Sequence, residues 1–366
     1  FLFDAPQYTT PIYILAIAIP FLVTERFLLL RLRMEEKAFK YSFFSIFLKL
    51  IIFFLTLFFI FMVRKDFLAV IYSNIIGQII GDFILLLVSL KDISLNIKLF
   101  DKKLIKDLLK FALPLALVAV IGWLFNSMDK VFLRTMSSYE QLGIYNIAMK
   151  ITNMLLIIQS SFTAFWVPVA YKWHSEKKNK ELYTLVSHSL NMLMCLVFLG
   201  ILLMKDLIPI FVSQAYKDAI YIIPFLMFYP IMYTVSETTT LGIVFSKKSY
   251  LNLIISILSI SVNFLLNFLL IKNYEAIGVA IATGISYIVF FWSRTLISRK
   301  LWYKFKLGKY IVTTLILFGV ALINVFIMNR IIVYLINIIS ILAIVYVYKD
   351  LIKYLYKKLF KGKVVA

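Results

Sequence analysis

The chain has 366 residues, of which 63% are hydrophobic and 16% are charged, and its mean hydropathy is +0.94. A soluble domain is roughly half apolar and a quarter charged, so this composition excludes a soluble globular protein. The formal net charge is +21, which in a soluble protein would indicate nucleic-acid binding. The single cysteine, Cys195, excludes a disulfide within the chain and any cysteine-based metal site.

Apolar runs of about 20 residues recur along the chain, and each is long enough to cross a hydrocarbon core of about 30 Å as a helix. Helices are expected because lipid offers the backbone no hydrogen-bond partners. The sequence therefore predicts an all-α, polytopic transmembrane protein with about eleven spans. The predicted spans are 11–30, 42–62, 67–90, 111–128, 142–170, 183–204, 219–245, 250–271, 276–297, 308–328 and 330–348.

Most lysines and arginines fall in alternate loops between these spans. The basic segments are 31–40, 91–110, 172–180, 247–248, 294–309 and 349–363. The positive-inside bias places them in the cytoplasm, with residue 1 outside and residue 366 inside. The net charge thus indicates topology and contact with anionic lipid, and no nucleic-acid partner is predicted. An odd number of spans that starts outside suggests that leading helices precede residue 1.

The stretch 111–170 contains two apolar runs joined by the polar loop MSSYEQLG. Polar groups interrupt the runs at Asn126, Asp129, Lys130, Asn146, Lys150 and Asn153. A charged group at the bilayer centre costs roughly 2.5–3.5 kcal/mol on insertion scales, so such groups usually face a protein interior or a wet cavity. This pair of helices therefore indicates a protein that moves something hydrophilic across the membrane.

Lys150 is the leading candidate for a cavity residue. Asn146, Lys150 and Asn153 are spaced i, i+4, i+7 and share one helix face. A cation beside two amides could attract the pyrophosphate or acidic sugars of a lipid-linked saccharide. The alternative is that Lys150 pairs with Asp82 or Glu237 and has a purely structural role.

A second polar stripe, formed by Asn74, Gln78 and Asp82, lies in the run 67–90. Gly77 and Gly81 lie beside it, and small residues at this spacing permit close helix approach. The stripe is therefore either a hydrogen-bonded seam between helices or, at Asp82, a site for a coupling ion or proton.

Other polar groups within the runs also have two interpretations. Asp129, an ion-coupling candidate, lies with Asn126 and Lys130 either in an outer gate or at the end of its helix. Glu237 lies among hydroxyl side chains that could line a wet path. Glu25 and Arg26 are expected to snorkel or to pair locally near the interface. The amides Asn263 and Asn267 are expected to bind a neighbouring helix, and the two histidines to lie near the membrane–water interface.

Three stretches resemble one family. FALPLALVAVIGWLFNSMDKVFL, followed by LGIYNIAMKI, resembles the seventh and eighth helices of bacterial lipid-linked oligosaccharide flippases. These are the O-antigen and capsule exporters of the multidrug/oligosaccharidyl-lipid/polysaccharide (MOP) superfamily. VNFLLNFLLIKNYEAIGVAIATGISYIV, at 262–289, is similar to a later helix pair of the same family, and RLRMEEKAFKY, at 31–41, to its basic loop after the fourth helix.

The resemblance implies a MATE-like bundle of two six-helix lobes around a central cavity. Three leading helices would be absent from a complete protein of fourteen. Residues 1–106 would be the rest of the first lobe, 107–300 the second lobe, and 301–366 a two-helix extension with a basic cytoplasmic tail. The implied substrate is an undecaprenyl-pyrophosphate-linked oligosaccharide, moved across the bacterial cytoplasmic membrane by alternating access coupled to H⁺ or Na⁺. A polysaccharide polymerase is the implied protein partner.

Three alternatives remain. A cation-coupled multidrug exporter or a peptidoglycan-precursor flippase would belong to the same superfamily. A membrane saccharide polymerase or acyltransferase usually needs a sizeable external loop or an intramembrane histidine base, and neither is evident. A structural scaffold would leave the polar stripes without a purpose. No GxxxxGK[ST] sequence occurs, so we expect a transporter, not an enzyme, with no cofactor, catalytic residue or metal site.

Overall fold

The computed structural model describes residues 9–35, 37–89 and 101–360, with only the backbone described at some helix ends and at many positions of 110–126. In these residues the chain is helical and contains no strand. Nine described helices are long and apolar enough to cross a membrane. This confirms the prediction of a polytopic helical membrane protein. The eleven predicted spans exceed the nine because one long helix covers two of them and because 111–128 is not among the nine.

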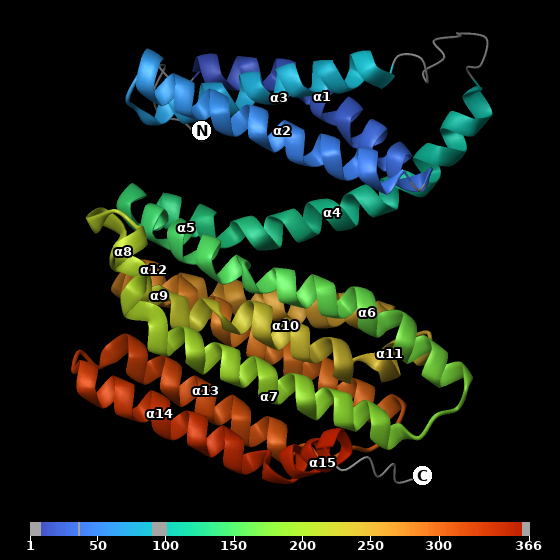
Figure 1. The fold of residues 1–366 in the computed structure, drawn as a ribbon, viewed down its shortest axis with the longest axis vertical. Coiled ribbons are helices and arrows are strands. Elements are labelled where there is room, and N and C mark those ends of the chain that lie inside the picture. The colour runs from blue at the N-terminus through green and yellow to red at the C-terminus, as the bar shows by residue number, and fades with distance from the viewer. Residues whose placement is uncertain (1–8, 36, 90–100, 361–366) are drawn as a thin grey trace. The chain divides into compact units, whose positions relative to one another are not determined.

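The chain divides into two compact units, residues 1–110 and 111–366, and the division falls within helix α4 (Lys102–Met136). In the first unit, α1 (Thr9–Met34), α2 (Ala38–Phe58) and α3 (Phe67–Ser89) pack against one another (Figure 1). A π-helical turn, Phe59–Val63, ends α2. The long apolar side chains of α1 and α2 largely point outward, as lipid-facing side chains do.

The seam between α2 and α3 depends on two glycines. A Cβ atom at Gly77 would lie 3.0 Å from Ile52 Cγ1 and 3.1 Å from Ile52 Cα, and one at Gly81 would overlap the side chain of Leu48. The close helix approach predicted from the glycine spacing is therefore confirmed.

The second unit contains the remaining helices. Their bounds are α5 (Tyr139–Asn153), α6 (Leu155–Ser175), α7 (Lys180–Met204), α8 (Ile208–Phe211), α9 (Ala219–Leu226), α10 (Phe228–Thr239), α11 (Leu241–Phe245), α12 (Tyr250–Leu301), α13 (Gly308–Phe326), α14 (Arg330–Val347) and α15 (Lys349–Phe360). Between α7 and α9, the segment 205–218 contains only α8 and two short 3₁₀ turns, Lys205–Leu207 and Gln214–Tyr216.

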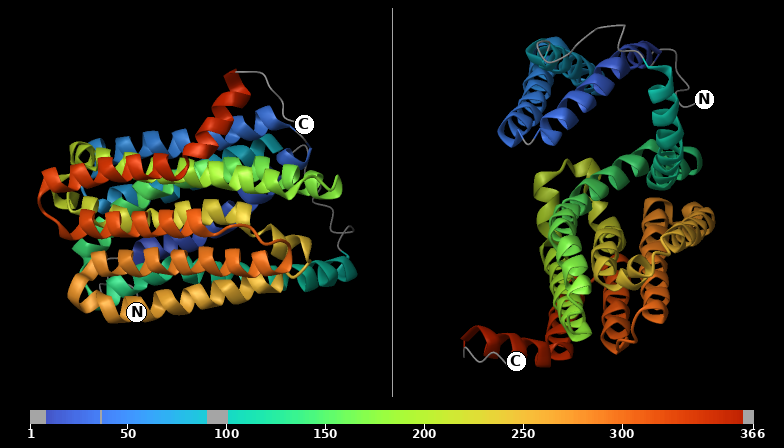
Figure 2. Two further views of the ribbon diagram at one scale, coloured as in Figure 1. Left: turned by 90° about the horizontal axis from the view of Figure 1, so that it is seen from below. Right: turned by 90° about the vertical axis from the view of Figure 1, so that its right-hand side faces the viewer.

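Helix α12 is two antiparallel helices joined at Glu275, where φ is 45° and ψ is −125°. A straight helix would separate residues 263 and 283 by about 30 Å, yet the Asn263 amide lies 3.4 Å from the Thr283 hydroxyl. The hairpin is the orange pair in Figure 2. Its two arms correspond to the predicted spans 250–271 and 276–297.

Helices α9 to α11 form the centre of the second unit. α10 packs against α6, α7 and α12, while α9 packs against α5, α12 and α13. The core around them is largely aromatic and aliphatic, with Phe198, Phe225 and Phe228 fully buried. The hairpin α13–α14 packs on α7 (Figure 1). The surrounding helices thus fix the position of α10, and its polar side chains form part of the sites described next.

Candidate transport sites

A buried carboxylate, Asp129, joins three helices of the second unit. The Tyr145 hydroxyl of α5 donates to Asp129 Oδ2 at 2.6 Å, and the Thr283 hydroxyl of α12 donates to the same oxygen at 2.7 Å. Asn267 Nδ2 donates to Asp129 Oδ1 at 2.7 Å and also to Asn263 Oδ1 at 3.0 Å. All five side chains are buried. The expectation that the two asparagines bind a neighbouring helix is therefore confirmed.

The donors around Asp129 are all neutral, and no described lysine or arginine forms an ion pair with it. In addition, Asn267 Oδ1 is buried without a hydrogen-bond partner among the described residues. An unpaired buried charge costs several kcal/mol unless it is neutralised. A proton or a small cation bound at Asp129 would neutralise this charge.

The interpretation of residues 126–130 as a helix end is wrong. α4 continues through Asp129 and Lys130 to Met136. Lys130 is exposed, and the side chain of Asn126 lies outside the described residues. The sequence could not show that the partners of Asp129 lie on α5 and α12, because those contacts span up to 154 positions along the chain.

The predicted cavity stripe lies on α5. Asn146 is half-buried, whereas Lys150 and Asn153 are exposed. The Lys150 ammonium group makes no hydrogen bond or ion pair with any described residue. In particular it does not pair with Glu237 of the same unit, whose partner is Arg294. The pairing of Lys150 with Glu237 is therefore not observed, and a role of its cation in binding a ligand stays a prediction.

In the first unit, Gln78 bridges two carboxyl groups. Its Nε2 atom donates to Glu25 Oε2 at 2.7 Å and to Asp82 Oδ1 at 2.8 Å. Asp82 is 2% exposed, and its Oδ2 atom has no described partner. The expectation that Glu25 snorkels or pairs locally is wrong, because Glu25 contacts α3. Asn74 does not join this group, since its amide donates to the Val70 carbonyl oxygen of its own helix.

Glu237 of α10 forms a buried ion pair with Arg294 of α12. Arg294 Nη1 lies 3.0 Å from Glu237 Oε1 and donates to Ser236 Oγ at 2.7 Å. The interpretation of Arg294 as part of a basic loop is wrong, since α12 continues to Leu301. Several lysines and arginines follow Arg294 closely in the sequence, so its role in an ion pair within the helices was not predicted. The recurrence of Tyr229, Tyr233 and Glu237 every four residues could have indicated the helix face on which Glu237 lies.

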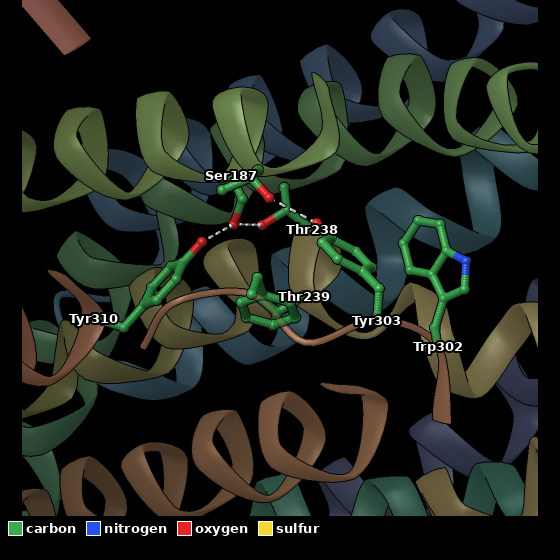
Figure 3. Close-up of a pocket in the computed structure, with 8 residues that line it drawn as sticks. Ser187, Thr238, Thr239, Trp302, Tyr303 and Tyr310 are labelled. Atoms are coloured by element: carbon green, nitrogen blue, oxygen red, sulfur yellow. Dashed lines mark hydrogen bonds between the residues drawn. The ribbon is translucent and has the colours of Figure 1, made fainter. Parts of the chain in front are cut away.

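Figure 3 shows a small polar cavity between α7, α10 and the segment before α13. Ser187 lies 2.7 Å from the Thr238 hydroxyl and 2.5 Å from the Tyr310 hydroxyl. Burial raises the pKa of the Tyr303 phenol, which also lines the cavity. The volume is about 10 Å³, room for about one water molecule. The cavity is a packing junction too small for a saccharide.

A second cavity, of about 40 Å³, lies beside Lys205 and Asp206, next to the turn that connects α13 to α14. Lys205 is 7% exposed, and its ammonium group donates to the carbonyl oxygen of Asn324 at 3.1 Å. That carbonyl belongs to the last turn of α13, where backbone oxygens lack helical partners. Lys205 therefore caps α13. Lys205 lies outside the basic segments predicted to be cytoplasmic, and its burial was not predicted from the sequence.

Comparison with known proteins places these sites in context. Residues 2–174 match the family model described as polysaccharide biosynthesis protein. The probable low-salt glycan biosynthesis flippase Agl15 of Haloferax volcanii is 23% identical over 225 residues, which are 60% of this chain and 47% of that protein. The chain thus spans about half the length of this curated relative.

A solved structure shares the fold. The lipid II flippase MurJ, in an inward closed conformation, matches 82% of this chain and 67% of its own chain, with a TM-score of 0.58 and 18% identity. Both proteins are named as flippases and neither as an enzyme.

Proposed function

Because residues 2–174 match the polysaccharide biosynthesis family model and the fold is shared with a lipid II flippase, we propose that the chain is a flippase of the MOP superfamily that translocates a lipid-linked oligosaccharide across a membrane by ion-coupled alternating access. The proposed substrate is an undecaprenyl-pyrophosphate-linked repeat unit for O-antigen or capsule synthesis. The proposed location is the bacterial cytoplasmic membrane, with the carboxyl terminus in the cytoplasm and a polysaccharide polymerase as partner.

The observation that carries this proposal is the Asp129 cluster. Its hydrogen bonds connect α4 and α5 with both arms of α12. Binding a proton or Na⁺ would neutralise the carboxylate and change the hydrogen bonding that holds these helices together. A ligand can shift a conformational equilibrium only by binding one state better than the other. We propose that Asp129 supplies this difference.

Two further groups of residues complete the proposal. Lys150, with Asn146 and Asn153 on the same face, would attract the pyrophosphate of the substrate. Asp82, bridged by Gln78 to Glu25, would be a second ion site in the first unit, because two nearby carboxyl groups hold a shared proton or cation more readily than one. Asn126 and Glu237 stay candidates for lining the cavity.

A peptidoglycan-precursor flippase is the second candidate, favoured by the fold shared with a lipid II flippase. A drug exporter of the same superfamily is less well supported, because the charge on the predicted cavity face of α5, shared with Asn146 and Asn153, is the cation Lys150. Like charge disfavours binding of cationic drugs. The two flippases differ in the phenotype that their loss produces.

The test is deletion of the complete gene in its source organism, followed by complementation with wild type, Lys150→Ala or Asp129→Asn. We expect deletion to abolish surface polysaccharide and to accumulate lipid-linked repeat units on the inner leaflet. Wild type should restore export, and both variants should restore it poorly. The matched control is Lys130→Ala, an exposed lysine beside the cluster, which should restore export fully.

Membrane preparations would separate the two roles. Asp129→Asn should make transport insensitive to an imposed H⁺ or Na⁺ gradient, whereas Lys150→Ala should keep the gradient dependence at a lower rate. Unchanged glycan in the deletion strain would overturn the proposal. Cell lysis with accumulated peptidoglycan precursor would favour the second candidate, and altered sensitivity to cationic dyes would favour a drug exporter.

A further inference from the structure

The face of α10 that is not packed carries three polar residues. From Ile222 to Ile243 every side chain is buried except Tyr229, Tyr233 and Glu237, which are half-buried. Their spacing of i, i+4, i+8 places them on one face. A helix otherwise buried on all sides therefore leaves a single strip uncovered, and that strip carries two phenols and a carboxylate.

The second arm of α12 adds a matching row of side chains. Phe290 stacks on Tyr233, with ring centroids 5.8 Å apart and planes 6° apart. Tyr287 lies against Tyr229, with centroids 4.5 Å apart. We call the half-buried part of this surface, Tyr229, Tyr233, Glu237 and Phe290 with the paired Arg294, the tyrosine strip.

Lipid is a poor partner for this surface. Arg294 and Glu237 are separated by 3.0 Å and both are about one-tenth exposed. Charged side chains within a span face a protein interior or a wet cavity, because hydrocarbon does not solvate them. Tyrosine hydroxyls on α10 would likewise lack hydrogen-bond partners in lipid. The tyrosine strip therefore faces a water-accessible space.

The paired charges of Glu237 and Arg294 favour a neutral ligand over a cationic one. A cationic drug would require a free carboxylate, but the Arg294 guanidinium neutralises Glu237. Arg294 also lies 5.0 Å from the centre of the Phe290 ring. What remains is a neutral surface of aromatic rings flanked by hydrogen-bonding groups. The C–H faces of a sugar ring pack against such rings, and its hydroxyls can bond to phenols, a carboxylate and a guanidinium.

We propose that the tyrosine strip binds the sugar rings of the transported lipid-linked saccharide. This inference rests on the proposed function and adds to it a second contact, distinct from the pyrophosphate contact assigned to Lys150. Tyr233 is the central residue, because it lies one helical turn from both Tyr229 and Glu237 and stacks on Phe290. Its ring should supply the sugar contact.

The test measures binding by the complete protein in lipid nanodiscs, using two tritiated probes and a scintillation proximity assay. One probe is undecaprenyl pyrophosphate bearing N-acetylglucosamine, and the other is undecaprenyl pyrophosphate without sugar. Loss of an aromatic contact corresponds to a change of about three- to tenfold in affinity. We expect Tyr233→Ala to weaken binding of the sugar-bearing probe by that factor and to leave binding of the sugar-free probe unchanged.

Two matched variants make the result specific. Tyr233→Phe keeps the ring and should bind the sugar-bearing probe within about twofold of wild type. Tyr346→Ala removes an exposed tyrosine of α14 and should alter neither probe. Tyr229→Ala provides a second test within the strip if Tyr233→Ala does not fold.

Equal weakening of both probes, or no weakening of either, would overturn the inference while leaving the proposed function intact. Failure of the wild-type protein to bind either probe would instead count against the proposed function. A wild-type protein that bound ethidium in place of both lipids would count against both.

Discussion

At the scale of single residues, the ion pair between Glu237 and Arg294 has the largest predictable effect on stability. Replacing Arg294 by Met would leave Glu237, whose side chain is 12% exposed, without its partner. Breaking a buried pair in this way costs about 3–5 kcal/mol. We therefore expect Arg294→Met to lower the unfolding temperature of the purified protein markedly, measured by tryptophan fluorescence during heating.

The matched control is the double variant Glu237→Leu, Arg294→Met. Replacing both members of a buried pair by apolar residues of similar volume is often neutral or stabilising. The double variant should therefore unfold close to the wild-type temperature. Equal losses in the single and the double variants would mean that packing, and not the uncompensated charge, governs stability at this position.

The residue scale is also where prediction from the sequence was weakest. Buried polar side chains could be identified as unusual within apolar runs, and Asp129, Asp82 and Glu237 were all found in this way. Their partners could not be identified, because Thr283 and Arg294 belong to helices far along the chain. Local periodicity carries information about the face of a helix but none about which helix covers it.

At the scale of helices, the α2–α3 seam allows a direct test of close packing. In Gly77→Ala the new methyl group would meet the Ile52 backbone at 3.1 Å. Because backbone cannot move aside cheaply, we expect a loss of about 1–3 kcal/mol in the free energy of unfolding. Urea or thermal unfolding of the protein in mild detergent would measure it.

The control is Gly200→Ala in α7, where no atom lies within 4 Å of the new methyl group. Alanine has a higher helix propensity than glycine by about 0.8–1.0 kcal/mol. This substitution should therefore leave stability unchanged or raise it. A similar loss at both positions would show that the two glycines matter for reasons other than helix contact.

Helix existence was predictable because each span needs a long apolar run, and the predicted spans are largely helical, although 142–170 is divided between α5 and α6 and 219–245 among α9, α10 and α11. Helix ends were harder to place. α4 continues eight residues beyond its predicted end at residue 128, and Asp129 within this extension is hydrogen-bonded to Tyr145 and to the α12 hairpin. The turn at Glu275 was expected as a short loop, but its positive φ has no signal in the sequence, since glutamate seldom adopts that conformation.

For the whole molecule, the tyrosine strip and the Asp129 cluster are linked through one face of α12. Thr283 donates to Asp129, and Tyr287, one turn further along, packs on Tyr229. Binding of an ion at Asp129 could therefore alter the position of the proposed sugar contact. This short connection within one unit offers a physical route for coupling ion and substrate.

The side from which the ion enters depends on the orientation of the chain. Glu140 and Lys177 lie near opposite ends of the span 139–175, and both are exposed. The positive-inside bias places Glu140 outside and Lys177 in the cytoplasm. In intact cells, a membrane-impermeant maleimide should label the complete protein carrying Glu140→Cys. The variant Lys177→Cys should be labelled only after the membrane is opened.

Cys195 is fully buried, and a buried thiol reacts slowly, so this residue should add little background labelling. The opposite pattern of labelling would show that the orientation of the chain in the membrane is the reverse of the predicted one. It would also reverse the proposed direction of ion entry. Asp129 lies seven residues before the carboxyl end of α4 at Met136, and the loop that leads to Glu140 follows this end. With Glu140 outside, the proposed ion would reach Asp129 from the external side, and an inward ion gradient would then drive the proposed outward movement of the saccharide.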